Sequence, residues 1–156
     1  MSELNTMPEL NTIPELTTVL GQVTEEVLEY MFFSGVTGEP AVSATGKRLC
    51  ATVSFTGSSN GALGVSVPPP VAAVLAAAFL GSEDEATDET QVRAVVGEIA
   101  NVICGVVLAR MNADGQFAIS TPEVIAGEDG DAVGKCEIQR HFEIIEGDLS
   151  VGLTVH

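Results

Sequence analysis

Two polar side chains on an otherwise apolar segment, Glu98 and Asn101, have the types and spacing that could do chemistry. The apolar residues around them recur at helical spacing, which predicts one long helix. Positions three apart on a helix differ by about 60° around its axis, so the carboxylate and the amide project from one strip of surface. Ala94, Gly97 and Gly105 share that strip, and such small side chains would let a partner protein approach closely. Taken alone, the pair is also explained by a solvated carboxylate and an amide that bonds a neighbouring loop or helix.

The composition limits the classes of partner. The chain has 156 residues, 46% of them hydrophobic, which suits one globular domain or two small, intimately packed halves. Its net charge is −16 with only six basic residues, so nucleic acids and anionic membrane surfaces would be repelled. The longest strongly apolar run, Val71 to Leu80, is shorter than the roughly 20 residues that span a bilayer, and no basic segment precedes an apolar stretch at the start. We therefore predict a cytoplasmic protein that binds neither nucleic acid nor membrane.

The cysteines and histidines do not form a recognisable reactive group. Cys50, Cys104 and Cys136 are far apart and lack a paired Cys or His spacing, so neither a disulfide framework nor a zinc site is expected. Each is predicted to be a small buried hydrophobe. His141 lies in a predicted strand and His156 ends the sequence, and neither has partners for a nucleophilic triad. The sequence predicts no metal and no cofactor of the protein's own.

The first twenty residues contain a six-residue repeat, with copies at 3–8, 9–14 and 15–20. A proline every sixth residue disfavours helix, so we predict a flexible tail over 1–16 and a folded domain over 17–156. Thr17 or Thr18 is expected to cap the first helix, which ends near Ser34. Its predicted apolar stripe consists of Val19, Val23, Val27, Tyr30 and Met31.

Turn signals divide the remainder into strands and helices. The cluster at 57–61 joins two β-branched runs into a hairpin, and residues 146–148 join two more. An Ala-rich helix is expected over 71–80, ended by Gly81, and Asp88 is expected to cap the helix that carries the polar pair and ends near 111–115. The predicted strands are residues 50–55, 62–67, 117–120, 136–145 and 149–155.

The two halves of the chain resemble each other. Residues 61–67 are echoed by residues 147–153, and on that alignment Glu26 and Glu29 fall opposite the polar pair, with the amide in the second copy only. Hairpins that alternate with packed helices indicate an α+β domain. We predict one largely antiparallel sheet packed with helices, built by divergent internal duplication of a helix-plus-hairpin unit.

These features together resemble a known family. Glu98-x-x-Asn101 followed by Gly105, the hairpin Gly61-x-Leu63, and the segment Ser120-Thr121-Pro122-Glu123-Val124-Ile125-Ala126-Gly127 are similar to the CheC/CheX/FliY chemotaxis phosphatases, and most of all to the CheX branch. The likeness runs from about Thr17 to Val155. It implies a CheC-like fold and the hydrolysis of the aspartyl phosphate on CheY-like response-regulator receivers in chemotaxis or two-component signalling.

The resemblance also implies roles for the polar pair. Asn101 would orient the attacking water, and Glu98 would pair with the receiver's active-site lysine. The receiver would supply magnesium, and the protein would form a homodimer with one Glu/Asn helix in each subunit. The chemistry is consistent, because an acyl phosphate is already reactive and an amide orients water without repelling the phosphoryl oxygens. One departure is Ala94, where family members often have Asp or Ser, and the loss of that side chain could weaken docking or activity.

Two alternatives remain at this stage. A non-catalytic adaptor or flagellar-switch-like module would bind a receiver without dephosphorylating it, and Ala94 leaves room for that interpretation. A purely structural dimer would pair through a sheet edge, for which residues 136–155 are the candidates. Only a phosphatase predicts release of phosphate.

Overall fold

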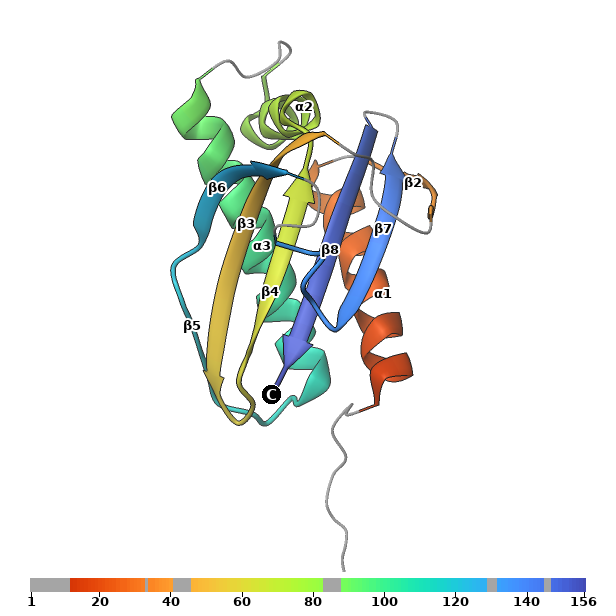
Figure 1. The fold of residues 1–156 in the computed structure, drawn as a ribbon, viewed down its shortest axis with the longest axis vertical. Helices are drawn as coiled ribbons and strands as arrows, with labels where there is room; N and C mark the ends of the chain where they lie inside the picture. The colour runs from red at the N-terminus through yellow and green to blue at the C-terminus, as the bar shows by residue number, and fades with distance from the viewer. Residues whose placement is uncertain (1–11, 33, 41–45, 83–87, 129–131, 145–146) are drawn as a thin grey trace, which may run out of the picture.

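The computed structural model describes residues 12–32, 34–40, 46–82, 88–128, 132–144 and 147–156. Within these residues, one sheet lies against two long helices, α1 and α3, and a shorter helix, α2, lies across one end of the strands (Figure 1). The elements are α1 (Ile13–Phe32), β2 (Val36–Gly38), β3 (Lys47–Gly57), β4 (Gly61–Val67), α2 (Pro69–Leu80), α3 (Glu89–Met111), β5 (Phe117–Ile119), β6 (Glu123–Glu128), β7 (Ile138–Ile144) and β8 (Gly147–Val155).

The sheet brings the two halves of the chain together at its centre. The strand order is β2-β7-β8-β4-β3-β5, with β6 also paired with β3, and every pairing is antiparallel. The hairpins β3-β4 and β7-β8 meet where β4 pairs with β8, from Gly61 opposite Val155 to Ser66 opposite Ser150. The predicted fold class, an α+β domain with one largely antiparallel sheet, is confirmed.

The remaining elements of each half pack against strands of the other half. Helix α1 packs on β7 of the second half, and α3 packs on β3 of the first half. Strand β2 follows α1 yet pairs with β7, whereas β6 follows α3 and pairs with β3. This approximate two-fold arrangement is the one that an internal duplication of a helix-plus-hairpin unit predicts.

The core lies between the sheet and the helices. Alternate strand residues point toward the helices, as expected for a sheet covered on one face. Fully or almost fully buried side chains include Val53, Phe55, Leu63, Val65, Leu149, Val151 and Leu153 from the strands, and Leu20, Val23, Leu28, Val96, Ile99, Ile103 and Val107 from the helices. Helix α3 is the one described helix long and apolar enough to cross a membrane, but these contacts make it the core helix of the domain.

Helix α1 begins earlier than predicted. It starts at Ile13, because Thr12 and Glu15 form a capping box. The Glu15 backbone N–H donates to Thr12 Oγ1 over 3.2 Å, and the Glu15 carboxylate accepts from the Thr12 hydroxyl over 2.7 Å and from its backbone N–H over 3.4 Å. The predicted start at Thr17 or Thr18 is wrong. Residues 13–16 of the predicted tail belong to α1, and residues 1–11 lie outside the described residues.

The other helix ends agree with the sequence. Asp88 caps α3, where its Oδ1 accepts from the backbone N–H groups of Thr90 at 2.9 Å and Gln91 at 3.2 Å. Gly81 ends α2 with a φ of 74°, which glycine adopts without steric cost. One member of the predicted α1 stripe is wrong, since Tyr30 is 74% exposed while the stripe continues through Leu28 to Phe32.

The face of the sheet opposite the helices is crossed by residues 132–137, which precede β7 (Figure 1). At the centre of that face Gly64 pairs with Gly152. A Cβ on Gly64 would lie 2.9 Å from the Ala132 carbonyl oxygen, and one on Gly152 would lie 2.6 Å from Cys136 Sγ. The two facing glycines therefore make room for the crossing segment.

Candidate functional site

The polar pair lies in the middle of α3. The two residues between them, Ile99 and Ala100, are fully buried, whereas Glu98 is exposed and Asn101 is half-buried. Among the described residues, none forms a hydrogen bond or ion pair with the side chain of Glu98 or Asn101. The carboxylate and the amide therefore have no side-chain partner in the described part of the domain.

Glu98 borders a hollow between α3 and the end of α2. The hollow has a volume of about 270 Å³ and is lined by Phe79, Leu80, Gln91, Ala94, Val95 and Glu98. Phe79 and Leu80 occupy the last turn of α2 and remain 39% and 48% exposed. The carboxylate therefore lies at the edge of a mostly apolar depression, and sequence reasoning missed this because α2 and α3 had no predicted contact.

Strand β6 approaches α3 at Gly97. A Cβ on Gly97 would lie 3.1 Å from Pro122 Cβ and 3.3 Å from Val124 Cγ2, and Gly97 is buried. The expectation that Gly97 belongs to the open strip is wrong, because its small size serves a contact within the domain. Asn101 follows Gly97 by one helical turn on the same side, so the amide lies next to this contact.

The segment that follows β5 is attached to β3 at Ser120. The Ser54 backbone N–H donates to Ser120 Oγ over 2.9 Å, and the Ser120 backbone N–H donates to the Ser54 carbonyl over 2.8 Å. This attachment carries Pro122 to α3 at Gly97, the residue before Glu98, although the two segments are separate in sequence. Ala94 and Gly105 stay in the open strip, since Ala94 is exposed and a Cβ on Gly105 would meet nothing.

The corresponding carboxylates on α1 have a different environment. Glu26 forms an ion pair with Arg110 of α3, with an N–O distance of 2.5 Å. The hydrogen bond from Arg110 lowers the pKa of the Glu26 carboxyl. Glu29 is exposed and stands where the second half has its amide. The first half therefore lacks both the free carboxylate and the amide of the second.

Of the remaining candidate side chains, Cys50, Cys104 and His141 are buried, Cys136 is partly buried and His156 is exposed. Cys50 and Cys104 are each 1% exposed, and burial raises the pKa of the Cys104 thiol to about 12. Burial also raises the pKa of the Cys136 thiol. The prediction that each cysteine is buried is confirmed for Cys50 and Cys104, and it is wrong for the partly buried Cys136. His141 Nδ1 lies 2.8 Å from Ser150 Oγ, but Ser150 is fully buried and out of reach of a substrate. Within the described ranges, no three His, Cys, Asp or Glu side chains are close enough to hold a metal ion.

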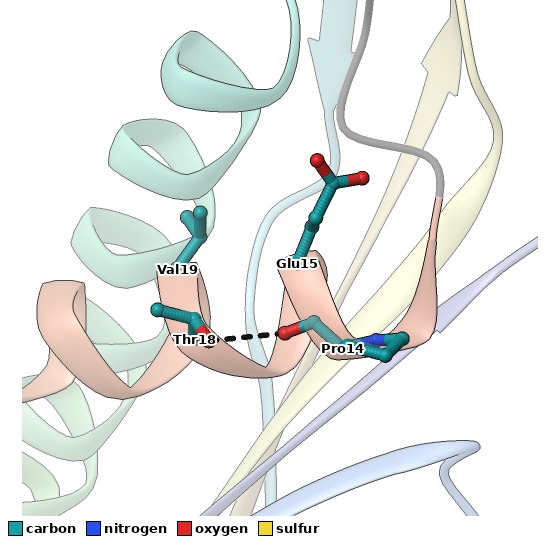
Figure 2. A pocket seen from close by; sticks show the side chains of 4 residues that line it. All are labelled: Pro14, Glu15, Thr18 and Val19. Atoms are coloured by element: carbon teal, nitrogen blue, oxygen red, sulfur yellow. Dashed lines mark hydrogen bonds between the residues drawn. The ribbon is translucent and has the colours of Figure 1, made fainter.

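A second hollow, of about 350 Å³, lies at the first turns of α1 (Figure 2). It is lined by Pro14, Glu15, Thr18 and Val19, and the Thr18 hydroxyl donates to the Pro14 carbonyl over 3.0 Å. The carboxylate of Glu15 is already used in the capping box. This hollow offers no pair of groups comparable with those on α3.

Several solved structures share this fold. The crystal structure of the chemotaxis protein CheX from Vibrio vulnificus superposes with a TM-score of 0.73 at 22% identity, covering 94% of this chain and 99% of that one. A CheX from Desulfovibrio desulfuricans gives a TM-score of 0.72 at 27% identity, covering 91% and 99%. A CheX–CheY–BeF3–Mg²⁺ complex from Borrelia burgdorferi gives 0.66 at 18% identity, covering 89% and 96%.

The sequence itself carries the family assignment. No curated protein matches the chain in sequence. Residues 49–143, more than half of the 156, match the family described as "Chemotaxis phosphatase CheX", and the matched range includes most of the hairpin β3-β4, all of α3 and the segment that reaches Gly97. The chain, with Glu98 and Asn101 on the core helix of this fold, belongs to the CheX family of chemotaxis phosphatases.

Proposed function

We propose that this protein hydrolyses the aspartyl phosphate of a CheY-like receiver, with Asn101 and Glu98 of α3 as the residues that act on it. The observation that carries the proposal is the pair of an exposed Glu98 and a half-buried Asn101, whose side chains have no partner in the described part of the domain, on the fold of a phosphatase family. The Borrelia CheX of similar fold was crystallised with CheY carrying BeF3 and Mg²⁺, which supports a receiver as the partner.

Asn101 orients the attacking water. An amide oxygen accepts a hydrogen bond from water while the amide NH₂ donates, so one side chain fixes both the position and the orientation of the nucleophile. The acyl phosphate needs little further activation, and hydrolysis is limited by bringing water in line with phosphorus. A neutral amide does this without repelling the phosphoryl oxygens, which a carboxylate at the same position would do.

Glu98 binds the receiver rather than the phosphoryl group. Its exposed carboxylate accepts a charge-assisted hydrogen bond from the receiver's lysine, and this contact sets the orientation of α3 on the receiver. Magnesium is held by the receiver, so the protein needs no cofactor of its own. The receiver thus neutralises the charge of the phosphoryl group with its magnesium, and α3 positions the water.

We further propose that the protein is a cytoplasmic homodimer. The outer side of β6 pairs with no other strand of the described sheet, and Ile125 on it is 51% exposed, which makes this edge a candidate for self-association. The edge suggested from sequence, residues 136–155, is less suitable because β8 lies inside the sheet. Sedimentation velocity of the full chain measures the mass in solution, and a monomer at micromolar concentration would contradict the proposal.

The test of the proposed function is the rate of phosphate loss from phosphorylated CheY-like receivers of the source organism. Asn101→Ala is expected to keep the fold and to lose roughly 10²-fold or more of the acceleration. Gln22→Ala is the matched control, because it removes another amide from a helix surface, on α1. Equal rates for wild type and Asn101→Ala would refute the assigned site, and binding without acceleration would favour a receiver-binding adaptor.

A further inference from the structure

The hollow beside Glu98 exposes two large apolar side chains in succession. Phe79 and Leu80 close α2, whose inner side is already buried through Val71, Ala72, Leu75, Ala76 and Ala77. Both side chains leave apolar surface in contact with water, which is unfavourable unless a partner covers it. Adjacent exposed apolar side chains next to a depression are characteristic of an interaction surface.

This surface is held in place before any partner arrives. The ring of Phe79 stacks on Phe32 of α1, with 5.3 Å between centroids and 23° between planes, and Phe32 is 2% exposed. The end of α2 is fixed by the left-handed Gly81 and by the Ser82 backbone N–H, which donates to the Ala77 carbonyl over 2.9 Å. A surface fixed in this way loses little conformational entropy when a partner binds.

The hollow and the proposed catalytic strip form one continuous surface. Glu98 lines the hollow together with Phe79 and Leu80, so a receiver whose ammonium reaches Glu98 also covers the apolar residues. A chain of net charge −16 repels the anionic phosphoryl group at long range, and one ion pair has to act against that repulsion. Burial of apolar side chains supplies attraction that does not depend on charge.

We propose that Phe79 and Leu80 are the apolar anchor of the receiver-docking surface and accept an apolar side chain from the receiver segment next to its phosphorylation pocket. This inference rests on the proposed function and adds the residues that set receiver affinity. In this arrangement α3 carries the residues that act on the aspartyl phosphate, and the end of α2 sets the affinity for the receiver. Loss of the anchor weakens binding of the receiver and leaves the rate within the complex unchanged.

The experiment compares Leu80→Ser with Ile13→Ser. Ile13 is a matched control, since it is 50% exposed and lies at the other end of α1, about 28 Å along the helix axis from Phe32 at 1.5 Å per residue. Affinity is measured for the receiver loaded with Mg²⁺ and beryllofluoride, and kcat and KM are measured with the phosphorylated receiver. Leu80→Ser is expected to raise Kd and KM about tenfold with kcat within twofold, and Ile13→Ser to change neither.

Each other outcome overturns one of the two proposals. If wild type binds and dephosphorylates the receiver while Leu80→Ser keeps the wild-type Kd, or loses kcat instead, the anchor is refuted and the phosphatase assignment stands. An equal loss for Ile13→Ser refutes the anchor as well. If wild type neither binds nor dephosphorylates any receiver, the proposed function fails and the anchor with it. Leu80→Ser is preferred to Phe79→Ser, because Phe79 also supports the fold through its stacking on Phe32.

Discussion

Replacement of Glu98 by Gln removes one negative charge and keeps the shape of the side chain. Glu98 is exposed and bonds no other described residue, so Glu98→Gln is expected to change the free energy of unfolding by less than about 0.5 kcal/mol. The effect on receiver binding is expected to be larger than the effect on stability, because the carboxylate lines the hollow that a bound receiver covers. A charge-assisted hydrogen bond that becomes desolvated contributes about 1.5–3 kcal/mol, against about 0.2–1 kcal/mol for an ion pair that stays in water.

The expected consequence is a loss of affinity. At about 1.4 kcal/mol for each factor of ten, Glu98→Gln raises the Kd of the Mg²⁺- and beryllofluoride-loaded receiver by roughly 10- to 100-fold. The rate within the complex stays within about threefold, because Asn101 is untouched. Isothermal titration gives Kd, and single-turnover dephosphorylation at saturating protein gives the rate.

The control for this substitution is Glu29→Gln, which removes an exposed carboxylate from α1, at the place that corresponds to Asn101. It has the same effect on net charge and none on the α3 surface. A shift in Kd of equal size for Glu29→Gln would mean that overall charge, and not a specific contact, governs docking. A Kd for Glu98→Gln within twofold of wild type would refute the assigned role of Glu98.

Two further expectations concern the fold that carries the site. Gly97→Val forces its new side chain against Pro122, where a Cβ alone would be 3.1 Å from the Pro122 Cβ, so urea unfolding is expected to show a loss of about 1–3 kcal/mol. The raised pKa of Cys104, about 12, means that the folded chain retains a thiol proton that the unfolded chain releases near pH 9. Its contribution to stability is therefore present below pH 9 and lost as the pH rises toward 12, and wild type and Cys104→Ala should converge in unfolding free energy over that range. Iodoacetamide at pH 8 should label Cys104 only after unfolding.

Local signals predicted the elements that depend on them. Asp88 and Gly81 act within a few residues of their own positions, and the structure places the start of α3 and the end of α2 where these residues indicated. Thr12 and Glu15 form a local capping signal of the same kind. The proline repeat around them nevertheless led to the prediction of a flexible tail. Here the capping box outweighed the proline, since a proline in the first turn costs a helix no hydrogen bond.

Two strands at the sheet edges, β2 and β6, were not predicted. Strand β6 pairs with β3, where Val124 lies opposite Ala51, and its order depends on that distant partner. Strand β2 has three residues and pairs with β7, more than a hundred positions later. Because neither has a long alternating pattern of its own, the sequence gives little indication of either.

The features of the candidate site also fall into those that local sequence predicts and those that depend on distant partners. The position of Glu98 and Asn101 on an open side of α3 follows from the helical period alone, and the structure agrees with it. The close contact of Gly97 with Pro122 and the hollow lined by Phe79 arise where elements distant in sequence come into contact. Such contacts depend on the topology of the sheet, which periodicity does not encode.

The approximate two-fold arrangement of the elements accounts for the proposal that one helix, and not two, acts on the receiver. Helices α1 and α3 lie on the same face of the sheet, and both have a glutamate followed by two buried residues and then a polar residue, Glu26 to Glu29 on α1 and Glu98 to Asn101 on α3. On α1 the first carboxylate is paired with Arg110 of α3, and the second polar residue is an acid that would repel a phosphoryl group. Arg110 thus neutralises the carboxylate charge with which a receiver lysine would pair. The guanidinium that links the two helices leaves Glu98 as the member of the duplicated pair that is free to bind another protein.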